Sequence, residues 1–408
     1  MRSQFLRRVG LATIVALSLT ACASGNGDDS ASPSASPAVI VDPQALTETV
    51  TGLREEMRAP GVAVLLLSPD GNFELADGTT QLNGATPVTL DDHVRIGSNT
   101  KTFTTSVILQ LVDEGKIGLT DPVDDYWPGI PNGDEITIEQ LLNMRSGLFN
   151  YTTTRKLNKS LDEDPDRVWE PRELLRMGIS RPPYFPPGEG WAYSNTNTVL
   201  LGLIAEKIEG KPLGDIIEER LITPLGLANT SFPPSDTASI PDPHPQGYMY
   251  GTNLSTIKSM ALPPAEQEAA AAGKLLPSDV TDENPSWAWA AGQMISTAGD
   301  LATWVKALGS EGVLSPELQQ KRLDSVAPAN DSLPAGSAEY GWGVAKFGTF
   351  YGHTGELPGF NSFMGYDPEN DVTLIVWSNL GSAANGDPVA TTIARSIIAE
   401  IYGANTAP

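Results

Sequence analysis

Strand-like segments stand near both ends of this 408-residue chain, and a long helical stretch separates them. Gly61 to Leu67 is an apolar run that predicts a strand, and a Pro-Asp-Gly turn leads back into Asn72 to Asp77. Three more strands are predicted at Val344 to Tyr351, Asn361 to Tyr366 and Val372 to Ser378. Hairpin turns rather than helices join them, which favours antiparallel pairing. Strands so far apart can share one sheet only if the two ends of the fold come together.

Helical patterns frame these strands and fill the stretch between them. Asp42 and Pro43 form a typical N-cap and first helical residue, and the pattern runs to about Arg58. Further helices are predicted at Ser98 to about Glu114, Leu141 to Met144, Glu170 to Met177, Thr198 to Glu209, Ala265 to Ala272 and Asp387 to Tyr402. We therefore expect an α/β fold with an antiparallel sheet flanked by helices. Residues 42–115 and 286–404 would form the α/β domain, and residues 116–285 an inserted, mostly helical domain.

A serine and a lysine stand three residues apart where one predicted helix begins. In Ser98-Asn99-Thr100-Lys101 the two side chains share a helix face, so the hydroxyl and the amine can meet. A neutral lysine could accept the serine proton if burial lowers its pKa. Backbone N–H groups at the helix start could also stabilise an oxyanion. The pattern recurs at Ser255 to Lys258, so it does not identify a site by itself.

Two more motifs follow in the chain. Tyr193-Ser194-Asn195 lies before the helix expected at Thr198, and His353-Thr354-Gly355 lies between predicted strands. The order Ser-x-x-Lys, Tyr-x-Asn, His-Thr-Gly resembles the active site of penicillin-recognising serine enzymes. The second Ser-x-x-Lys does not fit this series, because no Tyr-x-Asn stands between Ser255 and His353.

The resemblance covers roughly Ala45 to Tyr402 and includes further segments, such as Pro224-Leu225-Gly226-Leu227 and Tyr340-Gly341-Trp342-Gly343. It is to the branch that contains the class C β-lactamases, D-alanyl-D-alanine carboxypeptidases, and related esterases and D-amino-acid peptidases. It therefore implies a serine hydrolase with no metal or organic cofactor. Neither a zinc-type histidine motif nor a Gly-x-Ser-x-Gly elbow is present in the sequence.

The resemblance implies a role for each motif residue. Ser98 would attack a carbonyl carbon, while Lys101 and Tyr193 would take its proton. Tyr193 would then pass a proton to the leaving group, and water would hydrolyse the acyl-serine. Backbone N–H groups of Ser98 and Glu356 would form the oxyanion hole. Each residue also has a plainer interpretation, such as a packed loop aromatic for Tyr193.

Other residues would bind the substrate. Asn195 would contact the lysine or the substrate amide, or cap a helix, and Thr354 would contact a substrate carboxylate. Trp287 resembles a tryptophan near the substrate site of carboxypeptidase-type members. Gly355 would let the substrate backbone approach the strand. His353, if it is not a core histidine, has an ordinary pKa near 6.5 and would make activity vary between about pH 5.5 and 7.5.

The leading interpretation is a D-alanyl-D-alanine carboxypeptidase or β-lactamase-like hydrolase at the cell wall. Histidine at position 353, where β-lactamases of this branch usually have lysine, favours the carboxypeptidases and several other hydrolases. Carboxypeptidase-type members can carry an arginine where this chain has Ala345, and Lys346 would point to the other strand face. One alternative is an esterase or D-aminopeptidase on the same machinery. Another is a penicillin-reactive, wall-binding protein with little turnover.

The N-terminus carries a targeting signal. Basic residues, a short apolar stretch and small residues before Cys22 predict a signal peptide over residues 1–21. Cys22 is the chain's only cysteine, and its position resembles the lipobox of a bacterial lipoprotein. The alternative is an ordinary signal peptide cut near Ala21, which would leave Cys22 as a free thiol. Residues 22–41 would then be a lipidated cysteine and a flexible tether. The sequence thus predicts an extracytoplasmic protein, anchored to the cell membrane by lipid.

The net charge of −24 limits the partners. So acidic a surface repels phosphate backbones, which argues against a nucleic-acid partner. The expected partners are a small-molecule or peptide substrate (a cell-wall peptide, an ester or a β-lactam) and the membrane through the lipid anchor. His93 and His244 lie in loop-like segments without metal-ligand spacing.

Overall fold

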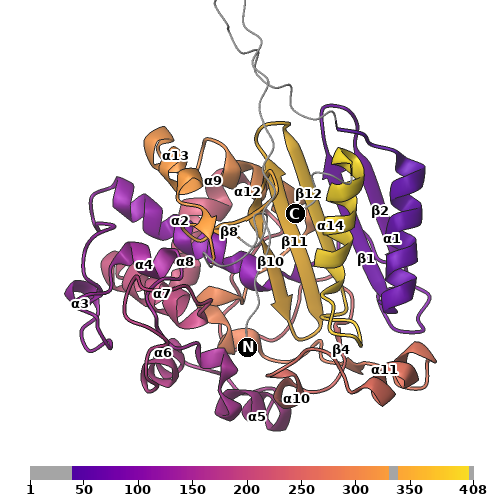
Figure 1. Ribbon diagram of the computed structural model, residues 1–408, viewed down its shortest axis with the longest axis horizontal. Coiled ribbons are helices and arrows are strands. Elements are labelled where there is room, and N and C mark those ends of the chain that lie inside the picture. The colour runs from indigo at the N-terminus through magenta and orange to yellow at the C-terminus, as the bar shows by residue number, and fades with distance from the viewer. Residues whose placement is uncertain (1–38, 330–338, 404–408) are drawn as a thin grey trace, which may run out of the picture. The chain divides into compact units, whose positions relative to one another are not determined.

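An eight-stranded antiparallel sheet organises the computed structural model, which describes residues 39–329 and 339–403 (Figure 1). The strand order is β2-β1-β12-β11-β10-β9-β8-β7, so β1 from the start of the fold pairs with β12 from its end. The strands are β1 (Gly61–Leu67), β2 (Phe73–Gly78), β7 (Ala327–Pro328), β8 (Glu339–Tyr340), β9 (Ala345–Phe347), β10 (Phe350–Leu357), β11 (Phe360–Asp367) and β12 (Val372–Ser378). The expected α/β class with an antiparallel sheet is confirmed.

The strand predicted over Val344 to Tyr351 is wrong. The structure has two antiparallel strands there, β9 and β10, with Phe347 paired to Phe350 across a tight turn. Gly348 in that turn adopts a φ of 61°, a left-handed conformation that glycine reaches without strain. As a result, His353-Thr354-Gly355 lies inside β10 and not between strands.

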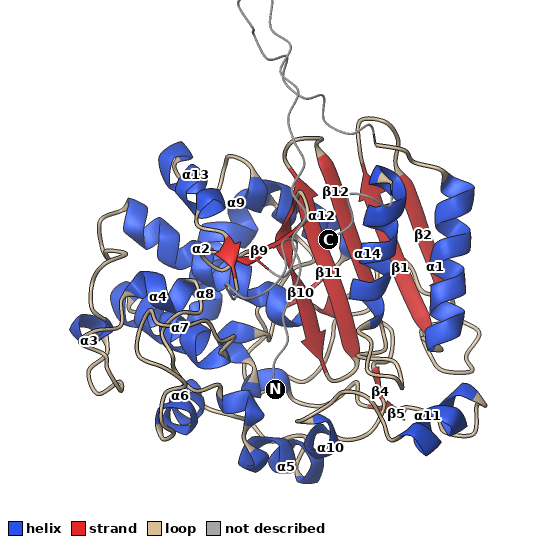
Figure 2. Cartoon of the chain, viewed as in Figure 1, coloured by secondary structure: helices blue, strands red, loops and turns tan. Residues whose placement is uncertain are grey.

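Helices cover both faces of the sheet (Figure 2). On one face, α1 (Pro43–Met57) packs against α14 (Val389–Tyr402), and both share an apolar cluster with every second residue of β1, beginning at Val62. The intervening residues Ala63 and Leu65 belong to the cluster on the opposite face, where α12 (Ala298–Gly309) contacts β11 and β12. Both faces of β1 are therefore buried, which accounts for its unbroken apolar sequence.

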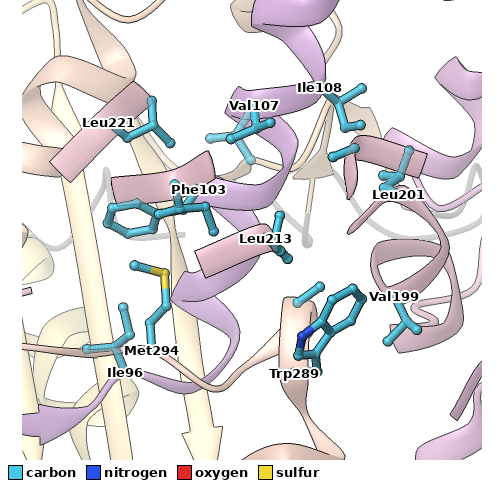
Figure 3. Packing of buried hydrophobic residues seen from close by; sticks show 14 of the residues in the cluster. Ile96, Phe103, Val107, Ile108, Val199, Leu201, Leu213, Leu221, Trp289 and Met294 are labelled. Atoms are coloured by element: carbon cyan, nitrogen blue, oxygen red, sulfur yellow. The ribbon is translucent and has the colours of Figure 1, made fainter. Parts of the chain in front are cut away.

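The remaining helices pack around α2 (Thr100–Asp113), which is buried along most of its length. α2 contacts α7 (Asn195–Glu209), and Phe103, Val107 and Ile108 of α2 lie in one apolar cluster with residues of α7 (Figure 3). Phe103 also stacks on Trp304, with a centroid distance of 3.8 Å. The other helices are α3 (Val123–Tyr126), α4 (Ile138–Leu142), α5 (Arg155–Glu163), α6 (Pro171–Ile179), α8 (Leu213–Ile217), α9 (Thr223–Leu225), α10 (Asn253–Thr256), α11 (Pro264–Ala271) and α13 (Pro316–Asp324). Short strands pair as β3 (Val94–Arg95) with β6 (Ile295–Ser296) and β4 (Tyr248–Met249) with β5 (Ser278–Asp279). This packing fixes the start of α2 against the edge of the sheet.

Some predictions fall outside what the structure tests. The domain boundaries at residues 115 and 286 stay a prediction. The predicted signal peptide, Cys22 and most of the tether lie outside the described residues. Within residues 39–329 and 339–403, no helix combines the length and the apolar character needed to cross a bilayer.

Candidate active site

Ser98 and Lys101 meet where the chain turns into α2. Ser98 is the middle residue of a 3₁₀ turn, η1 (Gly97–Asn99), and Lys101 lies in the first turn of the α-helix that continues it. Lys101 is fully buried, and its Nζ donates hydrogen bonds to Ser98 Oγ at 2.9 Å and to the carbonyl of Ala291 at 2.7 Å. Burial lowers the pKa of Lys101 well below its ordinary value. Burial thus favours the neutral form of an amine that is held against the serine hydroxyl.

Tyr193 lies on the other side of these two groups. Its ring centroid is 4.9 Å from Lys101 Nζ, and its side chain is hydrogen-bonded to Ser98. The rings of Trp191, Tyr340 and His353 surround it at centroid distances of 6.2 to 6.5 Å. Burial raises the pKa of Tyr193, so the phenol keeps its proton and can donate it.

Close backbone contact brings β10 to the start of α2. Gly97 has a φ of 51°, and a Cβ on it would lie 2.5 Å from the backbone nitrogen of Glu356. A Cβ on Gly355 would lie only 1.9 Å from the carbonyl oxygen of Ile96. Gly355 is therefore needed for packing against this backbone, and the close approach of substrate at Gly355 stays a prediction. The contact holds the N–H of Glu356 beside Ser98, where the oxyanion hole was expected.

His353 is buried in β10 and serves as a neutral link. Its Nδ1–H donates to the carbonyl of Thr354 at 2.6 Å, and its Nε2 lies 3.2 Å from the hydroxyl of Tyr340. Burial, followed by the nearby Lys101, lowers the pKa of His353 to about 3. The expectation that His353 titrates between pH 5.5 and 7.5 is wrong, because the protonated ring would be desolvated there and repelled by Lys101. Thr354 does not stand among the residues that line the cleft described below, so its expected contact with a substrate carboxylate stays a prediction.

Asn195 is the first residue of α7, so the helix begins three residues earlier than expected. Its side chain donates to Thr152 Oγ1 at 3.1 Å and to Asn150 Oδ1 at 3.3 Å, and no hydrogen bond joins it to Lys101. The N-cap position belongs to Ser194, which corrects the helix-cap interpretation. Asn195 instead lines the cleft in front of Ser98.

That cleft is open to solvent and has a volume of about 300 Å³. Ser98, Asn195, Glu356 and Ser382 line its polar part. Its apolar wall is made by Leu161, Met249, Tyr250, Ile257, Met260, Trp287, Leu357 and Pro358. The expected Trp287 does reach the cleft, and its carbonyl accepts a hydrogen bond from the hydroxyl of Tyr151 at 2.6 Å. The cleft thus combines this apolar wall with polar groups, which include Thr152, Asn158 and Asn253 in addition to those named above.

The second Ser-x-x-Lys motif has a structural role. Ser255 lies in the short helix α10, where its Oγ accepts from the backbone N–H of Thr252 at 2.8 Å, and its own N–H bonds the Thr252 side chain at 3.1 Å. This reciprocal arrangement is a capping box. Ser255 therefore caps a helix and does not line the cleft.

The sequence model of the family described as Beta-lactamase matches residues 46–397. The chain belongs to the β-lactamase family. The match contains all three motifs, and the chain is accordingly a serine hydrolase of this family. Within the described residues, no group of three or more His, Cys, Asp or Glu side chains is placed to hold a metal ion.

Family relatives include both penicillin-binding proteins and amidases. Penicillin-binding protein 4 of Amycolatopsis lactamdurans is 26% identical over 378 residues, which covers 87% of this chain and 89% of the relative. Penicillin-binding protein 4* of Bacillus subtilis (strain 168) is 26% identical, with coverage of 82% and 71%. Among solved structures, a D-stereospecific amidohydrolase from Streptomyces sp. has a TM-score of 0.73 at 28% identity, covering 89% of this chain and 99% of that one. D-amino acid amidase from Ochrobactrum anthropi SV3, complexed with D-phenylalanine, has a TM-score of 0.71 at 26% identity, with coverage of 88% and 99%.

Several cleft residues could not be found from the sequence. The wall residues between positions 249 and 260 come from a segment that reads as irregular, and Leu161 comes from α5, for which no helix was predicted. Ser382 follows β12 and carries no motif. Only the fold of this family member brings these segments to the serine.

Proposed function

We propose that this β-lactamase-family protein hydrolyses amide or ester bonds through an acyl-enzyme formed on Ser98. The observation that carries the proposal is the buried amine of Lys101, held 2.9 Å from Ser98 Oγ with its pKa lowered by burial. A surface lysine at a helix start would stay protonated and could not accept a proton. This arrangement matches the nucleophile-and-base pairing that covalent catalysis requires.

The first half-reaction forms the acyl-enzyme. Ser98 Oγ attacks the substrate carbonyl carbon while its proton moves to Lys101, and the carbonyl oxygen takes up negative charge. Backbone N–H groups of Ser98 and Glu356 stabilise that oxyanion. The proton then passes through the Tyr193 hydroxyl to the leaving nitrogen or oxygen as its bond to carbon breaks.

The second half-reaction releases the product. A water molecule attacks the acyl carbonyl and gives its proton to the Lys101–Tyr193 pair. The same N–H groups hold the oxyanion, and Ser98 Oγ leaves and regains a proton. One water is consumed for each bond cleaved, and the protein returns to its starting protonation state.

The charge of the cleft helps to choose among the candidate substrates. No lysine, arginine or histidine stands among its described lining residues, and Lys346 lies over the ring of Tyr351, 5.1 Å from its centroid. A substrate carboxylate, as in a D-alanyl-D-alanine peptide or a penicillin, would find no cationic partner there. The cleft thus favours an esterase or D-aminopeptidase type of activity. The similarity to a D-stereospecific amidohydrolase and a D-amino acid amidase supports small D-amino-acid substrates.

A second candidate is a D-alanyl-D-alanine carboxypeptidase or β-lactamase-like activity at the cell wall. The two penicillin-binding relatives favour it. A third is a penicillin-reactive protein with little turnover. For both, and for the amidase, we propose that the mature protein is extracytoplasmic and lipid-anchored through Cys22. Finding a Cys22→Ser variant still in the membrane fraction would refute the anchor.

The decisive experiment compares Ser98→Ala with Ser255→Ala, because both serines stand in Ser-x-x-Lys motifs. The full-length protein in detergent is given D-phenylalanine amide, a simple ester and a penicillin, and turnover and intact mass are followed. We expect Ser98→Ala to lose at least about 10³-fold in turnover and all covalent labelling, with Ser255→Ala close to wild type. A stable penicillin adduct without amide or ester turnover would favour the third candidate. Full activity of Ser98→Ala would refute the assignment.

A further inference from the structure

One carboxylate stands in the cleft without a cationic partner. Glu356 follows the His-Thr-Gly motif at the end of β10 and lines the cleft together with Ser98. Its Oε1 accepts a hydrogen bond from Ser382 Oγ at 3.1 Å, and Ser382 also lines the cleft. No lysine, arginine or histidine of the described residues forms an ion pair with it. Glu356 is thus a negative charge held beside the nucleophile with its other oxygen left to the cleft.

The position of Glu356 on β10 sets where its carboxylate lies relative to the bond that is cleaved. The backbone N–H of Glu356 faces the oxyanion position proposed above, and its side chain belongs to the same residue. Burial is the main reason that the pKa of Tyr193 is raised, and the charge of Glu356 adds to it, so this carboxylate lies close enough to affect a catalytic group. In an α-amino acid amide, the amino nitrogen is bonded to the carbon next to the carbonyl carbon. A carbonyl bound at the N–H of Glu356 therefore places an α-ammonium group within reach of the same residue's carboxylate.

We propose that Glu356, held by Ser382, binds the free α-ammonium group of the substrate and makes the protein selective for amides or esters of unacylated amino acids. The proposal rests on Ser98 being the acylated residue. It adds to the proposed function a named specificity-determining residue and a chemical class, amino-terminal acyl donors. The proposal excludes N-acylated substrates and substrates that carry a carboxylate where the α-ammonium group would bind.

The surroundings of Glu356 agree with this role. Burial raises the pKa of Glu356, and the hydrogen bond from Ser382 offsets only part of that effect. The side chain is exposed to the cleft, so an incoming ammonium group can reach it, and the water that a bound substrate displaces no longer screens the two charges. The apolar wall of the cleft, which includes Leu161, Ile257 and Met260, offers space for a large apolar side chain on the same substrate.

The test uses two substrates that differ only in the amino group: D-phenylalanine p-nitroanilide and 3-phenylpropanoyl p-nitroanilide. The quantity compared is the ratio of their kcat/KM values in full-length protein. We expect wild type to prefer the amino substrate by about 10- to 100-fold, the range of a charge-assisted hydrogen bond. In Glu356→Gln this ratio should fall to within about threefold of unity, and Glu356→Lys should reverse it.

Glu74→Gln is the matched control, because it removes the same charge from an exposed position on β2 and should keep the wild-type ratio. Covalent labelling of Ser98 by an activated ester shows that each variant is folded. A wild-type ratio near one, or an unchanged ratio in Glu356→Gln, would overturn the inference while the proposed function stands. Loss of turnover of both anilides in Ser98→Ala alone supports the proposed acyl-enzyme function separately. Wild-type protein that turns over neither the two anilides nor activated esters would overturn both proposals.

Discussion

Replacing Gly97 by alanine tests whether the contact between η1 and β10 sets the oxyanion hole. The added Cβ would lie 2.5 Å from the backbone nitrogen of Glu356, whereas ordinary contacts begin at 3.4 Å. The two backbones must therefore separate by about 0.9 Å, the difference between these distances. Oxyanion donors work at about 2.7 to 3.1 Å, so a shift of this size removes the Glu356 N–H from hydrogen-bonding range.

The loss of one such donor typically lowers kcat by about 10²- to 10³-fold. Because this hydrogen bond strengthens in the transition state, we expect kcat to fall far more than KM changes. Stability should fall as well, by about 1 to 2 kcal/mol, since a non-glycine residue at a φ of 51° is strained. Ester hydrolysis gives kcat and KM, and urea unfolding gives the free energy of unfolding.

Gly115→Ala separates the two effects. Gly115 has a φ of 68°, but a Cβ there would meet no atom within 4 Å. It should lose similar stability and keep its kcat. If Gly97→Ala turned over substrate within about threefold of Gly115→Ala, the close contact would not be what positions the Glu356 N–H, and the oxyanion assignment would have to be abandoned.

Three further predictions concern Tyr193, His353 and Glu283. Tyr193→Phe should lower amide turnover by about 10²- to 10⁴-fold but affect p-nitrophenyl esters much less, because p-nitrophenolate leaves without a proton; equal losses would exclude a proton-donor role. Activity requires neutral Lys101, so it should fall as the pH falls and Lys101 becomes protonated. The second cation in His353→Lys should lower the pKa of Lys101 further and move the acid limb of the pH–activity profile to lower pH. An acid limb that stays in place or moves to higher pH would contradict this. Burial and Asp162 raise the pKa of Glu283 to about 7. Between about pH 4.5 and 7 the folded state therefore binds more protons than the unfolded state, and the free energy of unfolding falls as the pH rises through that window. Glu283→Gln should therefore be more stable than wild type by about 1 to 3 kcal/mol at pH 8 and equal to it below pH 4.5, and urea unfolding with no pH-dependent difference would refute this.

Elements with strong local signals could be predicted from the sequence. β1 and β12 have the predicted bounds, because each is an apolar run closed by turn residues. The N-cap of α1 was also predicted correctly, since Asp42 accepts hydrogen bonds from the N–H groups of Gln44 and Ala45. In these cases the residues that decide the structure are adjacent in the chain.

Other features depend on partners distant in sequence. α7 starts with Asn-Thr-Asn-Thr, which reads as a loop, but Thr196, Asn197 and Thr198 are buried among other elements and continue the helix. The turn between β9 and β10 is hidden inside a mostly apolar run. The pKa of His353 depends on burial and on Lys101, which no local pattern reveals. The sequence motifs could indicate which groups would react, but not how their environments would tune them.

The pairing of β1 with β12 has a consequence for the order of assembly. Gly61 donates a hydrogen bond to the side chain of Asn379, 318 positions later, and Ile40 donates to the carbonyl of Ile401. As the chain is synthesised, β1 and β2 can form a hairpin early, but the neighbour that joins them to β11 and β10 emerges only near the end. Contacts of such long range make for slow folding. Until β12 is added, nothing in the sheet connects this early hairpin to the strand that supports Ser98, so a shorter nascent chain carries every catalytic side chain without a completed catalyst.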